Sequence, residues 1–169
     1  MKVMKFGGTS VGKPQRMQQV ASLVTKDDER KIVVLSALSG TTNALVEISE
    51  SLASGDRSAA KQQIEVLQQH YQHFVLELLQ EAETREKANV VLNEHFEFLT
   101  IILKISFSQA LNKDILAQGE LLSTKLFCIY LEEKKVDHVL LPALDFMTID
   151  SHDEPQVGTI KVKLAQLLN

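Results

Sequence analysis

Apolar residues in the first third of the chain cluster in the short runs that are typical of strands in a parallel sheet. Residues 3–6 and 32–35 form two such runs, and the second is continuously apolar, as in a strand covered on both faces. Between them, Pro14 suits the first turn of a helix, and apolar residues follow it on one helical face. The pattern therefore predicts a parallel strand–helix–strand unit, followed by a second helix over residues 43–53.

The middle of the chain changes to long helical periodicity. Residues 58–105 place apolar side chains on one stripe, with a polar break near residues 83–87, and this pattern predicts a helical hairpin. Beyond it we expect a helix over residues 112–134, a strand over 136–141, a possible strand over 146–149 and a last helix over 157–168. Three or four strands are few for a doubly wound sheet, so we expect the chain to be part of a larger domain.

Composition and charge narrow the class of protein. The 169 residues are 44% hydrophobic and carry a net charge of −4, with scattered Lys and Arg, which predicts a packed core and no nucleic-acid or anionic membrane partner. The single cysteine, Cys128, allows no intramolecular disulfide. We expect no secretion leader and no membrane span, because the apolar stretches are far shorter than the roughly 20 residues that cross a bilayer. The predicted location is the cytoplasm.

The first strand leads into a glycine loop suited to binding phosphate. The residues concerned are Lys5, Gly7, Gly8, Thr9 and Ser10. Paired glycines let backbone N–H groups approach an oligophosphate without a Cβ in the way, and a lysine adds a charge that can follow a moving phosphoryl group. A tight strand–helix turn with a solvated lysine is the simpler alternative. A Walker-type loop over residues 7–13 is disfavoured, because Pro14 offers no hydroxyl to Mg²⁺.

A second polar loop follows the second strand. Residues 36–43 hold five hydroxyl or amide side chains and Gly40 at the start of a helix. Because the carboxyl ends of neighbouring parallel strands face one crevice, we expect this loop and the glycine loop to present two helix N-termini to the same ligand. A cluster of helix N-cap residues without a ligand is the alternative.

The third signal is an acidic residue on the flank of a predicted helix. On a helical wheel, Glu120 falls between Phe127 and Leu131, and a buried carboxylate needs a cationic partner. Gly119 costs about 1 kcal/mol relative to alanine in a helix interior, which suits the close approach of another backbone or a ligand. An internal salt bridge from Glu120 to a lysine is the alternative.

Other polar residues give weaker signals. His70 and His73 have helical spacing but no third ligand nearby, so we expect no metal site from this chain. Asp145 and Asp150 flank the possible short strand and suit either helix caps or a site.

Taken in order, these three motifs resemble those of the aspartokinases, in the amino-acid kinase superfamily. The matching segments are residues 5–10, 36–43 and 119–123. The resemblance implies an α/β fold, a three-layer α/β/α sandwich with a mostly parallel sheet. Residues 1–169 would be the N-terminal, amino-acid-binding part of the kinase domain with a helical hairpin insertion. The ATP-binding half and the regulatory ACT domains of the family would lie outside this chain.

The resemblance also implies a reaction. Aspartokinases transfer the γ-phosphoryl group of MgATP to the side-chain carboxylate of L-aspartate, giving 4-phospho-L-aspartate for lysine, threonine and methionine synthesis. The attacking carboxylate, with a reference pKa of about 3.9, is already ionised at neutral pH, so that catalysis reduces to positioning and charge neutralisation. The expected cofactors are ATP and Mg²⁺, and the expected partners are L-aspartate and ATP.

The resemblance further assigns roles to individual residues. Lys5 would stabilise the transferring phosphoryl group, and the loop formed by Gly7, Gly8, Thr9 and Ser10 would bind its oxygens. Ser36 and Thr42 would hold the substrate. Glu120 would pair with the α-ammonium group of aspartate, which would give this carboxylate its cation. An arginine for the α-carboxylate would belong to the half of the domain outside this chain.

Three other hypotheses stay open. Another amino-acid kinase, such as an acetylglutamate, glutamate or uridylate kinase, would share the Lys-x-Gly-Gly start, although the long helical insertion and the Glu120 motif disfavour it. A bifunctional aspartokinase–homoserine dehydrogenase would carry its extra domain beyond residue 169. The third hypothesis is a non-catalytic assembly fragment. A sheet cut in mid-domain exposes an unpaired edge, so we also expect self-association into a homo-oligomer.

Overall fold

Two short parallel strands stand at the head of the chain. In the computed structural model, which describes residues 1–168, β1 (Lys2–Phe6) pairs with β2 (Lys31–Leu35) in parallel. The register places the last residues of the strands, Phe6 and Leu35, opposite each other, so both strands end at the same edge of the sheet. The predicted parallel strand–helix–strand unit is confirmed.

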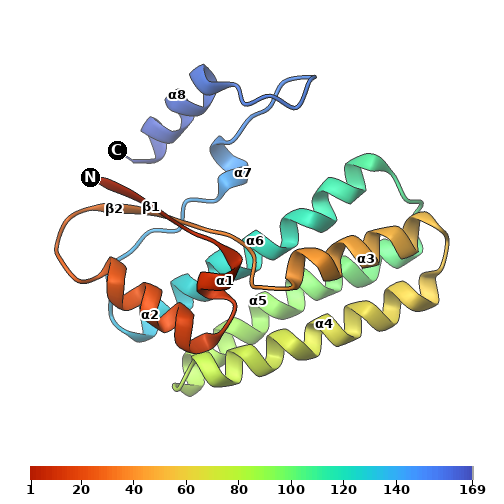
Figure 1. Cartoon of the computed structure of the whole chain (residues 1–169), viewed down its shortest axis with the longest axis horizontal. Helices are drawn as coiled ribbons and strands as arrows, with labels where there is room; N and C mark the ends of the chain where they lie inside the picture. Colours follow the sequence, from red (N-terminus) through yellow and green to blue (C-terminus); the bar gives the residue numbers. More distant parts are fainter. Residues whose placement is uncertain (169) are drawn as a thin grey trace. The chain divides into compact units, whose positions relative to one another are not determined.

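Helices make up most of the rest of the chain (Figure 1). They are α1 (Gly8–Val11), α2 (Pro14–Val24), α3 (Thr41–Ala53), α4 (Arg57–Leu78), α5 (Ala82–Ile101), a 3₁₀ turn (Ile102–Lys104), α6 (Gln109–Glu133), α7 (Ala143–Phe146) and α8 (Val157–Leu167). The chain forms two compact units, Met1–His138 and a second that begins at Val139, and each is described by itself. None of the described helices combines the length and the apolar character needed to span a membrane.

Four long helices of the first unit share one core. Helix α4 packs against α3 and α5, and α6 packs against α3 and α5, as Figure 1 shows. Large side chains that are almost fully buried come from all four helices and include Leu45, Ile48, Tyr71, Leu78, Leu92, Phe96, Leu99 and Ile115. Each such side chain stabilises the fold by roughly 1.5–3 kcal/mol relative to an exposed position. The apolar stripe predicted for the hairpin is confirmed as its buried face.

The turn of the helical hairpin lies earlier than predicted. Helix α4 ends at Leu78 and α5 begins at Ala82. The predicted break at residues 83–87 is therefore wrong, since these residues form the first turns of α5. Glu83 and Glu86 of this segment face solvent, whereas Thr84 is buried. The turn itself is held by a residue distant in sequence.

That residue is Glu133, near the end of α6. Its Oε2 accepts hydrogen bonds from the backbone N–H groups of Gln80 and Glu81, at 2.8 and 3.1 Å, and from the hydroxyl of Thr84 at 2.7 Å. The carboxylate thus satisfies donors at the start of α5, which have no partner within the helix itself. Burial alone would raise the pKa of Glu133, but these hydrogen bonds, with one from Lys134, lower it to about 2.

The segment after α6 is less regular than predicted. Residues 136–141 form no strand, and the possible strand over 146–149 is also absent. Helix α7 ends at Phe146, and Ile149 makes only an isolated antiparallel bridge to Pro155. A strand requires a neighbour for its backbone N–H and C=O groups. Within the described part of the chain, residues 136–141 pair with no strand, and residues 146–149 have only the bridge to Pro155. The sheet of the described residues therefore has two strands, while the last helix, α8, is close to its prediction.

Replacing Glu133 with glutamine should lower the free energy of unfolding by about 1–3 kcal/mol, because charge-assisted hydrogen bonds to buried donors are lost. Urea denaturation at pH 7 measures this. The carboxyl pKa is lowered from 4.5 to about 2 in the fold, so its contribution is complete above pH 4.5 and declines as the pH falls towards 2. The difference in unfolding free energy between the wild type and the variant should shrink over that range.

Glu132→Gln is the control, because the exposed ion pair of Glu132 with Lys87 contributes about 0–1 kcal/mol. Equal losses of unfolding free energy in the two variants would contradict the role assigned to Glu133 at the turn before α5.

Candidate active site

The two polar loops meet at the carboxyl edge of the parallel strands. The backbone N–H of Ser36 donates to the carbonyl oxygen of Phe6 at 3.0 Å, which extends the strand pairing by one residue. A Cβ added at Gly8 would lie 2.9 Å from the carbonyl oxygen of Ala37, and one added at Gly12 would overlap Ser39. Such a close approach of two loops needs residues without a side chain. The structure thus brings the glycine loop and the second loop together.

The glycine loop itself is shorter than expected, because Gly8–Val11 forms the single helical turn α1. Gly7 precedes it in an extended conformation and accepts a hydrogen bond from Ser10 N at 2.9 Å. Lys5 is exposed, and its Nζ lies 3.8 Å from the position of a Cβ at Gly7. Within the described residues, no acidic side chain forms an ion pair with Lys5. Its ammonium group therefore remains available beside the backbone of the loop.

Thr9 and Ser10 line a different surface. With Arg16 they border a cavity of about 320 Å³, and the guanidinium of Arg16 donates to the carbonyl oxygen of Thr9 at 2.7 Å. Gly8 and Gly12, in contrast, contact the second loop at Ser39. The cavity lined by Thr9 and Ser10 includes no residue of the second loop.

Helix α6 packs directly on the second loop through its small residues. A Cβ added at Gly119 would lie 2.7 Å from the Cβ of Ala37 and 3.1 Å from Cγ2 of Thr41. The predicted close approach at Gly119 is confirmed, and the approaching segment is the second loop. The buried hydroxyl of Ser123 donates to the carbonyl oxygen of Ser36 at 2.8 Å. Ser123 belongs to the third motif, but the sequence indicated no role of its own for it, although a small polar residue four positions after Gly119 lies on the same helical face.

Glu120 is exposed, so the expectation of a buried carboxylate is wrong. The helical wheel places Glu120 beside apolar positions. The second loop, however, contacts the neighbouring face of α6, which carries Gly119 and Ser123. Glu120 lies at the border of that contact, where its Oε1 accepts a hydrogen bond from Ala37 N at 3.4 Å. The described residues provide no ion pair for it, so the carboxylate is open to a cation from outside the chain.

The second loop ends in a glycine with a left-handed backbone. Gly40 has φ 86° and precedes α3, which begins at Thr41, two residues earlier than predicted. Thr42 is exposed in the first helical turn, whereas Thr41 is buried and shares a hydrogen bond of 3.0 Å with the hydroxyl of Tyr71. The structure therefore places Ser36 next to Ala37, whose backbone N–H donates to Glu120, and it places Thr42 in the first turn of α3.

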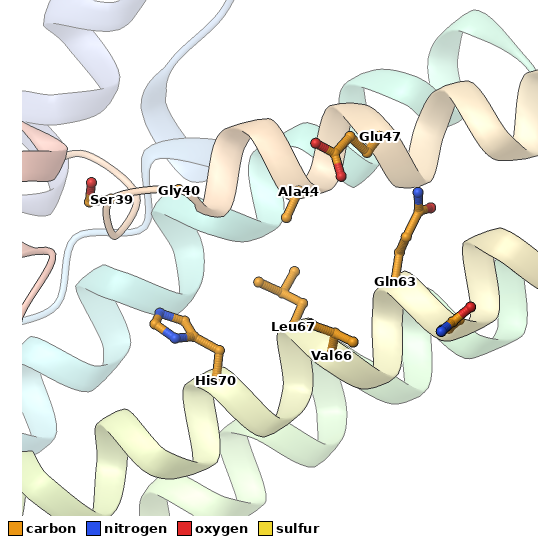
Figure 2. Close-up of a pocket in the computed structure, with 9 residues that line it drawn as sticks. Ser39, Gly40, Ala44, Glu47, Gln63, Val66, Leu67 and His70 are labelled. Carbon is orange, nitrogen blue, oxygen red and sulfur yellow. The ribbon is translucent and has the colours of Figure 1, made fainter.

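A groove of about 470 Å³ lies beside this loop, between α3 and α4. Figure 2 shows Ala44 and Glu47 on α3 facing Gln63, Leu67 and His70 on α4. The lining also includes Ser39, Gly40, Gln62 and Val66. The groove touches the second loop but does not include the lysine or the carboxylate described above, so the candidate site and the groove are neighbouring features.

Comparison with known proteins places this arrangement in a family. The chain matches the amino acid kinase family over residues 1–169. It belongs to the amino acid kinase family. It is similar to the lysine-sensitive aspartokinase 3 of Escherichia coli (strain K12), with 35% identity over 134 residues, covering 79% of this chain and 29% of that protein. It is also similar to the chloroplastic aspartokinase 2 of Arabidopsis thaliana, with 38% identity over 143 residues, covering 80% and 25%.

The structure agrees with these relatives. It matches the crystal structure of E. coli aspartokinase III in complex with aspartate and ADP with a TM-score of 0.82 and 29% identity, covering 99% of this chain and 37% of that one. The predicted resemblance to the aspartokinases and the amino-acid-kinase-like α/β fold with a small parallel sheet are confirmed. The chain spans between a quarter and two fifths of the length of these relatives.

Replacing Gly119 with alanine should lower the free energy of unfolding by about 1–3 kcal/mol, because the added methyl group would force α6 away from Ala37 and Thr41. This loss would outweigh the gain of about 1 kcal/mol in helix propensity. The matched control is Gly158→Ala in α8, where an added Cβ meets no atom within 4 Å and the same gain is expected without the clash. Thermal unfolding of both variants measures the difference, and a stabilised Gly119→Ala chain would refute the close contact.

Proposed function

We propose that this chain is the N-terminal, amino-acid-binding part of an aspartate kinase. The observation that supports this most strongly is the meeting of three elements at the carboxyl edge of β1 and β2. These elements are Lys5 with the glycine loop, the second loop, and Glu120 of α6. They supply a cation and backbone N–H groups to the phosphoryl group that is transferred from ATP, and a carboxylate to the amine of the amino acid that receives it.

The reaction needs little covalent chemistry from the protein. A side-chain carboxylate oxygen of L-aspartate attacks the γ-phosphorus of ATP, and the bond from that phosphorus to the β–γ bridging oxygen breaks, with its electron pair leaving on ADP. No proton has to be removed from the ionised nucleophile. Lys5 and the N–H groups of the glycine loop neutralise the charge of the migrating phosphoryl group, as positioning and electrostatics dominate such transfers.

The same edge of the sheet would hold the amino acid. Glu120, exposed and without an ion pair among the described residues, pairs with the α-ammonium group of aspartate. Ser36 and Thr42 hold its polar groups from the second loop. The ammonium of Lys5 and the carboxylate of Glu120 thus bind opposite charges of the substrates and keep their orientation relative to each other.

Magnesium would arrive with the nucleotide. Residues 1–168 contain no group of three or more His, Cys, Asp or Glu side chains that could hold a metal ion, and Mg²⁺ is commonly bound through substrate phosphates. When bound, the ion supplies positive charge to the phosphate oxygens. The adenine site, the ACT domains and the assembly into a homo-oligomer belong to the same proposal, as do a cytoplasmic location and a role in lysine, threonine and methionine synthesis. The bifunctional alternative uses the same residues and stays a prediction.

The chain by itself should show no aspartate-dependent turnover of ATP, because the proposed adenine site lies outside it. A coupled assay for ADP release with L-aspartate and MgATP measures this. The complete kinase that contains this chain should turn over in the same assay. Robust turnover by residues 1–169 alone would overturn the assignment as a partial domain, and a complete protein inactive with aspartate would overturn the proposed function.

Substitutions in the complete kinase should separate the two roles. Lys5→Ala should lower kcat by about 10²–10³-fold with little change in the KM for aspartate, since the lost cation acts on the transferring group. Glu120→Ala should raise the KM for aspartate by about 10–10²-fold, since a charged hydrogen bond contributes roughly 1.5–3 kcal/mol. Lys13→Ala and Glu47→Ala are the matched controls and should leave both constants unchanged. The reverse pattern would contradict the roles assigned to Lys5 and Glu120.

A further inference from the structure

Tyr71, in the middle of α4, reaches the second loop with its hydroxyl. Its side chain is fully buried, and its hydroxyl shares the 3.0 Å hydrogen bond with Oγ1 of Thr41, which is also buried. A buried tyrosine hydroxyl needs a polar partner, and this one is met 30 residues away in sequence. The bond joins the helical hairpin to the first residue of α3.

Thr41 is held from two sides. Its hydroxyl faces Tyr71, and its Cγ2 lies 3.1 Å from the position of a Cβ at Gly119. No side chain caps the N-terminus of α3, and the preceding Gly40 has the freest backbone of any residue type. The backbone N–H groups of Thr41 and Ala44 donate to Leu38 and Gly40. The contacts of the Thr41 side chain add a restraint on the direction of the first turn of α3, and hence on Thr42.

The ring of Tyr71 is itself firmly placed. Phe96 lies edge-on at 5.9 Å between ring centroids and His70 at 6.0 Å. Burial raises the pKa of the Tyr71 hydroxyl, the hydrogen bond with Thr41 lowers it, and the negative charge of Glu120 raises it further, with a net shift upward. The hydroxyl is thus protonated at neutral pH, and it lies within electrostatic reach of the carboxylate proposed to bind the amino acid.

We propose that Tyr71 is a positioning residue for the amino-acid substrate, which it aligns by holding Thr41 and the start of α3 against α6. This inference rests on the proposed function and extends it to the helical hairpin. The hairpin then contributes to substrate binding from inside the core, without touching the ligand. Ala37 and Thr41 contact α6 at the same residue, Gly119, and the backbone N–H of Ala37 donates to Glu120. The same restraint therefore keeps the second loop and Glu120 in register.

A thermodynamic cycle tests the pair of hydroxyls. The variants are Tyr71→Phe, Thr41→Val and the double variant, because each single change leaves one buried hydroxyl without its partner and the double change removes both. Thr41→Ser keeps the hydroxyl but loses the Cγ2 methyl beside Gly119, so it should show a smaller effect than Thr41→Val if the hydrogen bond to Tyr71 is the main restraint. Tyr130→Phe is the control, since Tyr130 is buried on α6 and, among the described residues, no hydrogen bond joins its hydroxyl to the second loop.

Two measurements report on each variant. In the chain itself, amide hydrogen exchange of residues 37–42 should become about tenfold faster in each single variant, equivalent to about 1.4 kcal/mol, while exchange in α5 stays unchanged. In the complete kinase, the KM for aspartate should rise about tenfold at nearly constant kcat. The double variant should be no worse than either single one, as expected for residues that act through one shared bond.

The outcomes separate this inference from the proposed function. A complete kinase that is inactive with aspartate would remove the proposed function, while the exchange rates would still decide whether Tyr71 restrains the loop. Unchanged exchange of residues 37–42 in Tyr71→Phe, or faster exchange spread evenly over all the helices, would show Tyr71 to be a core residue only. Altered exchange with an unchanged KM in an active kinase would overturn the link from Tyr71 to the substrate.

Discussion

The absent side chain at Gly119 is the constraint on which the candidate site depends. Helix α6 can approach the second loop only because no Cβ stands between it and Ala37, where one would lie at 2.7 Å. Two hydrogen bonds follow from that approach, from Ser123 to the carbonyl oxygen of Ser36 and from Ala37 N to Glu120. Each contributes about 1 kcal/mol, which offsets the similar cost of a glycine inside a helix.

The charges at this edge of the sheet are left unpaired by the fold. Lys5 and Glu120 are both exposed, and among the described residues neither forms an ion pair with the other or with a neighbour. Exposed charges attract each other weakly in water and salt, so the fold loses little stability by keeping them apart. Separated charges of opposite sign are what a zwitterionic amino acid and a phosphoryl donor require together. The two unpaired charges therefore agree better with the proposed binding of ligands than with a role in stability.

The sequence predicted those elements whose formation depends on residues close to one another in the chain. The apolar runs of β1 and β2, the proline at the start of α2 and the stripe of the hairpin all carry their periodicity in the sequence. The turn before α5 does not, because Glu133 reaches it from α6, and residues 136–141 form no strand because pairing depends on a neighbour. In the site, the low helix propensity of glycine allowed the close approach at Gly119 to be predicted. The exposure of Glu120 could not be predicted, because it depends on which face of α6 the second loop contacts.

Tyr71 joins the core of this fold to the candidate site. By its spacing it is one more residue of the apolar stripe on α4, and it does pack there against Phe96. Its hydroxyl is the polar end of a side chain that belongs to the core, and that end meets the first residue of α3. Since a close-packed interior transmits small displacements, a shift of the hairpin would move the start of α3. The conformation of the second loop is thus coupled to the packing of the hairpin through this hydrogen bond.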